Sequence, residues 1–525
     1  MNKNIKFIAT AAIGVIALSS CGGAQGKVIN MWTGFGASMT TALENVLETY
    51  SENHKDSGFD IIHTGQGGYD NLLSAITGSV STRTYPQLAV AYPDHMAQYN
   101  ESNILFALDG NIEKDKLNLD DFYPNYLQEC KEISEGKVMG LPFNKSTEVL
   151  TTNKTFVDAL IGLTKEAEGD DKIVKVPSTW QELEKFGDAA NKVLNNAAVY
   201  TYDKESKTDK VTTKRGAFKA VICKSKTGED YKVYESKTKV NPDYSIIVDL
   251  STISSNDFRI LSYDSQPNFF ITIVRQWGGT YTKIEKDANG NSVGYMHYKS
   301  TETVSALKFF KGLFSKKYIG IPSDFGEASY TSTPFKAFKT IFTIGSSAGV
   351  SNCVPADNLF DVEINPIPFN AEKPDCKFVI SQGTNLVMFK NTDEESRNET
   401  WNLLKTLAAD PETNATFAKT SGYIPVTKSA YNTPTYQNYL KDTTLKGTAK
   451  TMRDAINVNF DEYLGENTGW IQFVDPGFVG SSSIRANVGS VMGALRDIKN
   501  ANPTDDELNK LLDTYYQMNK PHIKK

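Results

Sequence analysis

The sequence predicts an α/β fold in which helices cover a mainly parallel sheet. In the first part of the chain, short apolar segments alternate with longer segments whose apolar residues recur at helical spacing. Such alternation is typical of parallel sheets, because a connection between parallel strands must cross back over the sheet, usually as a helix. The chain has 525 residues, and chains of this length usually divide into two or more domains.

The first predicted elements follow from their local residue patterns. Residues 27–32 form a short apolar run that is typical of a buried strand. Residues 38–54 repeat apolar side chains at helical spacing, which predicts a helix. A second strand at 59–62 leads through the glycine-rich turn 65–69 into another helix.

A third predicted strand, 87–91, ends at Tyr92-Pro93-Asp94. Parallel sheets of this kind bind ligands beyond the carboxyl ends of their strands. The residues that follow the three strands are therefore candidate ligand contacts, namely 32–35, Tyr69 and 92–94.

The stretch 202–240 differs from the rest of the chain in charge. It holds 11 Lys or Arg residues against 6 Asp or Glu residues, with Val, Tyr and Thr between them. This composition predicts a solvated β-hairpin or loop insertion, and a basic patch that docks a partner is the functional alternative. The remainder resumes α/β character and ends with predicted helices at 454–463 and 505–518.

The first twenty residues have the pattern of a lipoprotein signal peptide. Lys3 and Lys6 form a basic start, and residues 7–18 are an apolar run too short to span a bilayer. Cys21 directly after Leu-Ser-Ser resembles a bacterial lipobox, in which the precursor is cut before the Cys, which then carries the lipid. We therefore expect residues 1–20 to be removed, 21–26 to be a linker, and the protein to be lipid-anchored in the cell envelope outside the cytoplasm. An ordinary secretory signal with an incidental cysteine is the alternative.

Composition argues against several classes of partner. The formal net charge is −6, and removing Lys3 and Lys6 with the leader makes it more negative by two. An acidic chain of this kind lacks the basic face that nucleic acids require. No later segment is long and apolar enough to predict a membrane span, so attachment through lipid alone is expected.

The cysteines do not predict a metal site, and no cofactor is expected. None of them is spaced as Cys-x-x-Cys, and the chain holds only 5 His. Disulfides remain possible in an oxidising compartment, while buried free thiols are the favoured interpretation. The cysteines beyond the leader are Cys130, Cys223, Cys353 and Cys376.

Four later segments place small, polar and aromatic residues at predicted strand ends or helix starts. They are 142–154, 345–349, 382–385 and 421–431. Small residues let a ligand approach the backbone, and hydroxyls with exposed amides suit an anion or a polyol. Each segment alone is also compatible with a plain turn.

Together and in this order, the segments resemble the extracellular solute-binding proteins of carbohydrate-type ABC importers, and most of all their glycerol-3-phosphate-binding branch. Residues 142–154 match Pro-Phe-Asn-x-Ser-Thr-x-Val-Leu-x-x-Asn-Lys, and 422–431 match Gly-Tyr-x-Pro-x-Thr-Lys-x-Ala-Tyr. Residues 177–180, Pro-Ser-Thr-Trp, are similar to a helix start of that family. The resemblance extends from Val28 to about Leu495.

The resemblance implies a two-lobe periplasmic-binding-protein fold of type II, hinged and with an interleaved chain. Lobe 1 would comprise 27–147 plus 383–420, and lobe 2 would comprise 148–382 plus 421–525. The chain would cross between the lobes near 147–153, 378–383 and 419–425. A solute would close the lobes around itself, and the closed monomer would dock on a membrane permease powered by a separate ATPase.

Eight ligand contacts are expected, and the resemblance implies all of them except Asn268. Tyr69 and Tyr423 would pack on the solute from opposite sides. Arg485 matches the phosphate-binding arginine of the family, with a planar fork suited to bidentate contact. A surface salt bridge for Arg485 and half-buried packing for the tyrosines are the alternatives. The remaining contacts are the hydroxyls of Ser146 and Ser346, the amide of Gly383, the carboxylate of Asp94 and the side chain of Asn268.

One departure from the family concerns residues 264–269, where the glycerol branch places tryptophans. This chain reads Asp-Ser-Gln-Pro-Asn-Phe there, and Ser265, Gln266 and Asn268 would bond a more polar ligand. The expected solute is therefore a sugar, a polyol or a phosphorylated polyol. Neutral oligosaccharides are the alternative within the same fold.

Two rival classes of function can be set against this interpretation. Residues 345–349 satisfy Gly-x-Ser-x-Gly, the nucleophile elbow of serine hydrolases, with Ser347 as nucleophile. A triad would then need His522, which lies in a basic tail poorly suited to hold an imidazole in place. We therefore expect no enzyme. A purely structural surface lipoprotein, the other rival, would have no small-molecule cleft.

Overall fold

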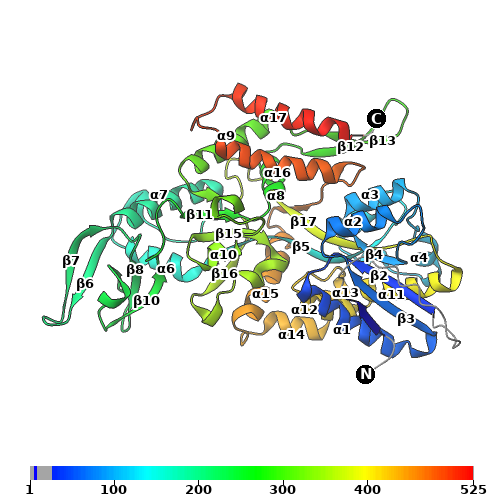
Figure 1. Cartoon of the computed structure of the whole chain (residues 1–525), viewed down its shortest axis with the longest axis horizontal. Helices are drawn as coiled ribbons and strands as arrows, with labels where there is room; N and C mark the ends of the chain where they lie inside the picture. Colours follow the sequence, from blue (N-terminus) through cyan, green and yellow to red (C-terminus); the bar gives the residue numbers. More distant parts are fainter. Residues whose placement is uncertain (1–4, 9–26, 524–525) are drawn as a thin grey trace.

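One long sheet connects the two halves of the molecule. The structure is a computed structural model that describes residues 5–8 and 27–523 (Figure 1). Within the described residues this sheet has 11 strands in the order β1-β3-β2-β4-β17-β5-β15-β11-β14, with β16 added to β5 and β18 added to β17. The strands are β1 Ile5–Ile8, β2 Lys27–Thr33, β3 Phe59–Gly65, β4 Leu88–Ala91, β5 Leu141–Asn153, β11 Arg259–Tyr263, β14 Ile319–Gly320, β15 Thr340–Ser346, β16 Val362–Asn365, β17 Lys377–Met388 and β18 Trp470–Phe473.

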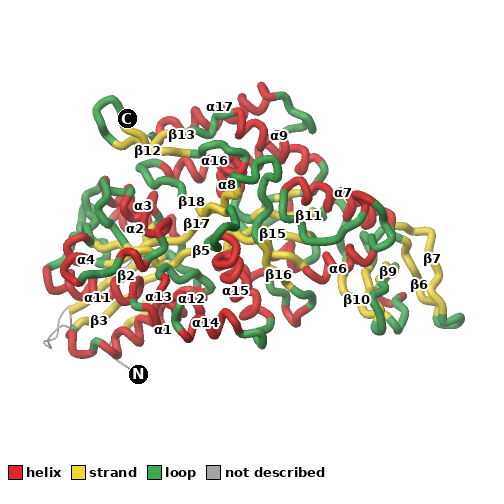
Figure 2. Tube along the Cα trace, turned by 180° about the vertical axis from the view of Figure 1, so that it is seen from behind, coloured by secondary structure: helices red, strands yellow, loops and turns green. Residues whose placement is uncertain are grey.

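The strands β5 and β17 run antiparallel through the middle of this sheet and cross from one half to the other (Figure 2). The C-terminal end of β17 pairs with β4, and the C-terminal half of β5 pairs with β15. All 13 residues of β5 are buried, although the strand contains both Lys145 and Glu148. The predicted crossings near 147–153 and 378–383 therefore fall on two paired strands rather than on loops.

The first core is the cluster of buried apolar side chains around β2, β3 and β4. The predicted helix at 38–54 is α1, Ala37–Asn53, and it buries Leu43, Val46, Leu47 and Tyr50 on one face, as its spacing predicts. The other helices of this half are α2 Tyr69–Gly78, α3 Pro93–Glu101, α4 Asp109–Asp115, α5 Pro124–Lys131 and α11 Glu394–Ala409. The predicted strands at 27–32, 59–62 and 87–91 are confirmed as β2, β3 and β4.

The second core surrounds β11, β15 and β16. The Pro-Ser-Thr-Trp segment begins a helix as predicted, because the Thr179 side chain accepts from the N–H of Glu182 and Trp180 is fully buried. The helices around this core are α6 Lys154–Leu163, α7 Trp180–Asn196, α8 Gln266–Gln276, α9 Thr301–Ser315, α10 Ser332–Lys336, α16 Ser481–Asp497 and α17 Asp505–Asn519. A separate hairpin, β12 Thr282–Lys286 and β13 Ser292–Met296, lies beside α17 (Figure 1).

A third, small cluster of buried side chains lies near the predicted crossing at 419–425. It joins α12 Pro411–Ser421, α13 Lys428–Tyr431, α14 Pro434–Lys441 and α15 Gly447–Val458. Val426 belongs to the first core. The packing therefore changes gradually here and gives no sharp boundary between residues 420 and 421. The predicted helix at 454–463 is the end of α15 followed by a π-helical turn, Asn459–Tyr463.

The charged stretch is larger and better packed than a solvated hairpin. It forms part of a separate five-stranded sheet, β10-β8-β9-β6-β7, at the far left of Figure 1. Val199, Ile222, Val233 and Val248 of this sheet join the second core. The prediction of a solvated insertion limited to 202–240 therefore fits β7, which is mostly exposed, and is wrong for β8 and β9, whose Ile222 and Val233 belong to the core. The strands are β6 Ala198–Asp203, β7 Thr208–Arg215, β8 Val221–Ser225, β9 Tyr231–Tyr234 and β10 Tyr244–Asp249.

Most of the predicted leader, together with Cys21 and the linker 21–26, lies outside the described residues. The exception is β1, which pairs in parallel with β3. Among the residues that the structure describes, no helix has the length and apolar character needed to cross a membrane. Cys130, Cys223, Cys353 and Cys376 are free thiols, and the first three are buried.

Candidate functional site

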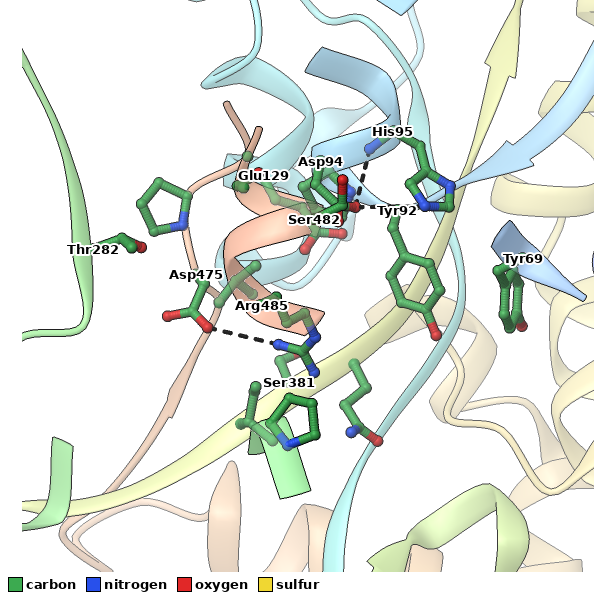
Figure 3. A pocket seen from close by; sticks show the side chains of 18 of the residues that line it. Tyr69, Tyr92, Asp94, His95, Glu129, Thr282, Ser381, Asp475, Ser482 and Arg485 are labelled. Carbon is green, nitrogen blue, oxygen red and sulfur yellow. Dashed lines mark hydrogen bonds and ion pairs between the residues drawn. The ribbon is translucent and has the colours of Figure 1, made fainter. Parts of the chain in front are cut away.

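A cavity of about 440 Å³ lies between the first core and the second core, beside the crossing strand β17 (Figure 3). The starts of α2 and α3, with Glu129 on α5, form the wall on the side of the first core. The segment 474–477 and the start of α16 form the opposite wall. Residues 380–383 of β17, together with Pro267, Tyr281 and Thr282, complete the lining. A concave space of this size between two domains is typical of a small-molecule site.

The wall on the side of the first core presents two tyrosines. The Tyr69 and Tyr92 rings meet edge to face with centroids 4.8 Å apart. Burial raises the pKa of both phenols, so they stay neutral at ordinary pH. The chain can turn into α2 because Gly67 and Gly68 adopt positive φ, and Gly34 lets a neighbouring segment pass against the backbone of Gly68.

The opposite wall carries a carboxylate between two arginines. One oxygen of Asp475, Oδ1, lies 3.7 Å from Nη2 of Arg275, and the other, Oδ2, lies 3.8 Å from Nη1 of Arg485 (Figure 3). Neither Asp475 oxygen has a hydrogen-bond partner among the described residues. Burial raises the pKa of Asp475, while the two guanidinium groups oppose the shift. This carboxylate keeps free acceptor capacity at the cavity.

Gly383 brings the backbone of β17 to the cavity. Its φ is +103°, and a Cβ atom there would lie 1.8 Å from the carbonyl oxygen of Asn144 on the paired strand. Only glycine fits this position. The Gly383 carbonyl accepts from Nζ of Lys145 at 3.3 Å, and the same ammonium group forms a buried ion pair with Glu129.

Three helices, α2, α3 and α16, begin at the cavity. Gly68 and Gly480 precede α2 and α16, and no side chain caps the start of either helix. The unpaired N–H groups of a helix start and the positive end of its dipole favour a negatively charged or oxygen-rich ligand group. Asp94 on α3 and Asp475 add acceptors for hydroxyl donors. The cavity can therefore bind a ligand that carries both kinds of group.

The structure brings four of the eight predicted contacts to the cavity surface: Tyr69, Asp94, Gly383 and Arg485. The other four are not among the residues that line it. Ser146 and Ser346 hydrogen-bond each other at 3.3 Å where β5 meets β15. Asn268 is 1% exposed and accepts from Arg485. Tyr423 is buried and stacks on Phe417 with ring centroids 6.4 Å apart.

Sequence reasoning missed several residues of the lining, among them Asp475, Ser482 and Glu129. Asp475 follows β18 in the segment 474–477, Val-Asp-Pro-Gly, and a Pro-Gly pair directly after a strand is the signal that could have pointed to it. It also missed Glu148, a charged residue inside the quoted motif, which is fully buried behind Asn268.

Ser347 has a structural role in this fold. It is buried, and its Oγ accepts from the backbone N–H of Thr147 at 3.1 Å, which ties the start of the 347–353 turn to β5. Among the described residues, no histidine ring nitrogen hydrogen-bonds Ser347. This geometry gives no support to the hydrolase alternative. Within residues 5–8 and 27–523, no cluster of three or more His, Cys, Asp or Glu side chains could hold a metal ion.

Comparison with known proteins gives a consistent family pattern. A family model described as "Bacterial extracellular solute-binding protein" matches residues 46–444. Two lipoproteins of Mycoplasma pneumoniae are each 23% identical to the chain, over 416 and 412 residues. These matches cover 64% of the chain but 52% and 51% of the two relatives. The chain thus spans about half the length of these relatives.

Solved structures resemble the chain over nearly its whole length. UgpB from Mycobacterium tuberculosis, in complex with glycerophosphocholine, has a TM-score of 0.63 and 14% identity, with coverage of 95% of this chain and 98% of that chain. Lmo0181 from Listeria monocytogenes, in complex with cycloalternan, has a TM-score of 0.62 at 14% identity and covers 94% and 99%. MalE from Bdellovibrio bacteriovorus, bound to maltotriose, has a TM-score of 0.58 at 15% identity and covers 93% and 100%. At such low identity, this likeness establishes the fold, two α/β lobes built around a shared sheet.

Proposed function

The chain belongs to the bacterial extracellular solute-binding proteins, and on this premise we propose that it captures a sugar, a polyol or a phosphorylated polyol in its interlobe cavity. It would then deliver that solute to the membrane permease of an ABC importer. The likeness to UgpB and to MalE-type proteins supports an importer of the carbohydrate type.

The observation that carries this proposal is the two-sided lining of the cavity. Tyr69 and Asp94 belong to the first lobe, whereas Asp475 and Arg485 belong to the second. A ligand that contacts both sides binds the closed arrangement more tightly than the open one and shifts the population toward closure. A permease could thus distinguish the loaded protein from the empty one.

The chemistry of the lining supports a polyhydroxylated solute. Tyrosine rings such as Tyr69 and Tyr92 pack on the apolar face of a sugar or polyol, and Asp94 and Asp475 accept from its hydroxyls. Arg485 and the start of α16 suit an acidic group. The complex of UgpB with glycerophosphocholine agrees with this pairing of a polyol and a phosphate.

The four predicted contacts that do not line this cavity remain part of the proposed binding set. Asn268 supports Arg485, and Tyr423 lies close enough to Tyr69 to help raise the pKa of its phenol. Ser146 and Ser346 join the crossing strand to the second lobe. In this arrangement they hold the contacting residues in place.

A neutral oligosaccharide is the second candidate ligand. Arg485 is already engaged by Asn268 and Asp475, so the cavity carries no free excess of positive charge. Similar solved structures hold maltotriose or cycloalternan. The two candidates differ in one feature, the acidic group, and this can be tested.

The proposed location and partners depend on the leader. We propose that Cys21 carries the lipid and that residues 21–26 tether a monomeric binding protein to the membrane. Tethering raises the local concentration of the binding protein near its permease. The lobes are proposed as 27–147 plus 383–420 and 148–382 plus 421–525, with the third crossing inside the cluster around α12 to α15.

The proposal can be tested on the chain that begins at residue 21, with Cys21 replaced by Ser to keep it soluble. Native mass spectrometry of protein purified without denaturation would detect a retained solute. Thermal shift and calorimetry with sugars, polyol phosphates and glycerophosphodiesters would follow, since a ligand that binds only the folded state raises the melting temperature. Unchanged melting curves across all three classes, with no retained solute, would contradict the proposal.

A further inference from the structure

A buried carboxylate on the crossing strand β5 is linked to the cavity through a single amide. Oε1 of Glu148 accepts from Nδ2 of Asn268 at 2.9 Å, and Oε2 accepts from the hydroxyl of Tyr263. Asn268 in turn accepts, through Oδ1, from Nη2 of Arg485. Glu148 does not line the cavity, whereas Arg485 does. The three side chains thus connect β5, α8 and α16.

Hydrogen-bond chemistry fixes the direction of this link. An ionised carboxylate can only accept, and a guanidinium group can only donate. The amide of Asn268 must therefore turn its Nδ2 toward Glu148 and its Oδ1 toward Arg485. The charge on Glu148 sets the orientation of the amide, and the amide provides the acceptor that holds one side of Arg485.

The fold itself does not require a charge at this position. Glu148 is 1% exposed, and β5 is buried along its whole length. A buried carboxylate costs desolvation free energy that an apolar residue in the same place would avoid. Its link through Asn268 to Arg485, which lines the cavity, gives it a role in the site rather than in packing.

We propose that Glu148 is a positioning residue, which orients Arg485 in the cavity through Asn268, and that protonation of Glu148 weakens this orientation. The inference rests on the proposed function only in assigning Arg485 to a ligand. The orientation itself is a property of the empty protein and can be measured without one. When Glu148 is protonated, its O–H can donate to the Tyr263 oxygen and its other oxygen still accepts from Asn268, but this hydrogen bond is then no longer assisted by a charge.

The surroundings of Glu148 support titration in an accessible range. Burial raises the pKa of Glu148 to about 7, while the hydrogen bonds from Tyr263 and Asn268 and the charge of Arg485 lower it. The charge of Asp264 raises it. The other groups that face it are Tyr463, whose phenol has a raised pKa, and Ser346, its register partner on β15.

The test is the reactivity of Arg485 in the ligand-free protein. Phenylglyoxal modifies accessible arginines, and peptide mass spectrometry gives the rate at each site. The rate for Arg485 is divided by the rate for Arg397 in the other lobe, so that the intrinsic pH dependence of the reagent cancels. The variants are Glu148→Gln and Asn268→Ala. The matched control is Glu399→Gln, which replaces a buried carboxylate of the first lobe that accepts from Tyr50.

We expect the rate ratio to rise about threefold or more in Glu148→Gln, which removes the charge assistance, and in Asn268→Ala, which removes the hydrogen bond. It should stay unchanged in Glu399→Gln. In the native protein the ratio should rise as the pH falls through about 7, whereas in Glu148→Gln it should be flat. If Glu148→Gln does not fold, Asn268→Ala supplies the same comparison at constant pH.

An unchanged ratio in both variants would overturn the inference, and so would an equal rise at every arginine, which indicates general loosening. Both readouts are independent of any ligand. A second measurement relates the Glu148–Asn268–Arg485 link to ligand binding. It is calorimetry with glycerophosphocholine, whose phosphodiester does not titrate near neutral pH. Weaker binding to Glu148→Gln than to native protein is expected. No binding to the native protein would count against that ligand class and leave the Arg485 result standing.

Discussion

Gln98 on α3 donates from Nε2 to Oγ of Ser482 on α16 at 3.2 Å, and this hydrogen bond joins the two lobes at the edge of the cavity. Close packing accompanies it, since a Cβ atom on Gly477 would lie 2.4 Å from the carbonyl carbon of Pro93. The lobes therefore touch on the side where α3 meets α16. Any opening of the cavity must break this contact.

Replacing Gln98 with Ala should weaken ligand binding by destabilising the closed arrangement. A half-buried neutral hydrogen bond contributes about 0.5–1.5 kcal/mol, so an affinity loss of about two- to tenfold is expected. Calorimetry with the solute identified by mass spectrometry measures it. Gln437→Ala is the matched control, because Gln437 donates to the Tyr431 carbonyl within one small cluster and does not join the lobes. Equal losses in the two variants would refute a role in closure.

Replacing Arg485 with Ala should discriminate between the two ligand classes. A charge-assisted hydrogen bond contributes about 1.5–3 kcal/mol, so a phosphorylated solute should lose about tenfold or more in affinity. A neutral sugar should lose much less. Calorimetry with a pair of ligands that differ only in the phosphate group measures the difference.

Arg496→Ala is the control for this experiment, since Arg496 lies on the same helix but pairs with Asp324 and Asp497 away from the cavity. Arg485→Lys keeps the charge and removes the planar fork. An equal loss for both ligands in Arg485→Ala would rule out phosphate recognition and favour the neutral oligosaccharide.

Glu148 should make the native protein less stable as the pH rises. Its pKa in the folded state is about 7, above the ordinary value of 4.5 that applies when the chain is unfolded. Between these two values the folded state holds a proton that the unfolded state has released, so the free energy of unfolding falls as the pH rises. The total loss should be about 3 kcal/mol.

Urea denaturation of native protein and Glu148→Gln, at a series of pH values, isolates this effect. Below about pH 4.5 the difference in stability between the two proteins should be constant, and from there to about pH 7 it should move in favour of Glu148→Gln. Parallel stability curves for the two proteins across that range would show that Glu148 does not titrate as its burial predicts.

Local patterns in the sequence were sufficient for β2, β3, β4 and α1 of the first lobe and for the turn into α2. The spacing of Leu43, Val46 and Tyr50 gave the buried face of α1, and the glycines before Tyr69 gave the turn that brings this residue to the cavity. These features depend on neighbours within a few residues of the chain, so periodicity and turn chemistry reveal them.

Features that depend on distant parts of the chain were not predictable in the same way. A charged residue in a strand usually faces solvent, but β5 is covered on both faces, so Glu148 is buried behind Asn268, 120 positions further along the chain. Asp475 reaches the cavity only because β18 pairs with β17. The high charge of 202–240 likewise concealed the apolar face that packs on the second core.

Replacing Gly383 with Ala should destabilise the protein at the crossing itself. A Cβ atom there would lie 1.8 Å from the carbonyl oxygen of Asn144, and φ at +103° is strained for any other residue. Because the clashing atom belongs to the backbone of the paired strand, no side-chain rotation can relieve it, and a loss of at least about 2 kcal/mol is expected. Gly312→Ala in α9 is the control, since a Cβ atom there meets nothing within 4 Å, and it should add about 0.5–1 kcal/mol. Urea denaturation measures both changes. A Gly383→Ala protein as stable as the native one would mean that β5 and β17 can move apart at the cavity without loss of stability. The close pairing of the two crossing strands at Gly383 would then not be a constraint on how the lobes move.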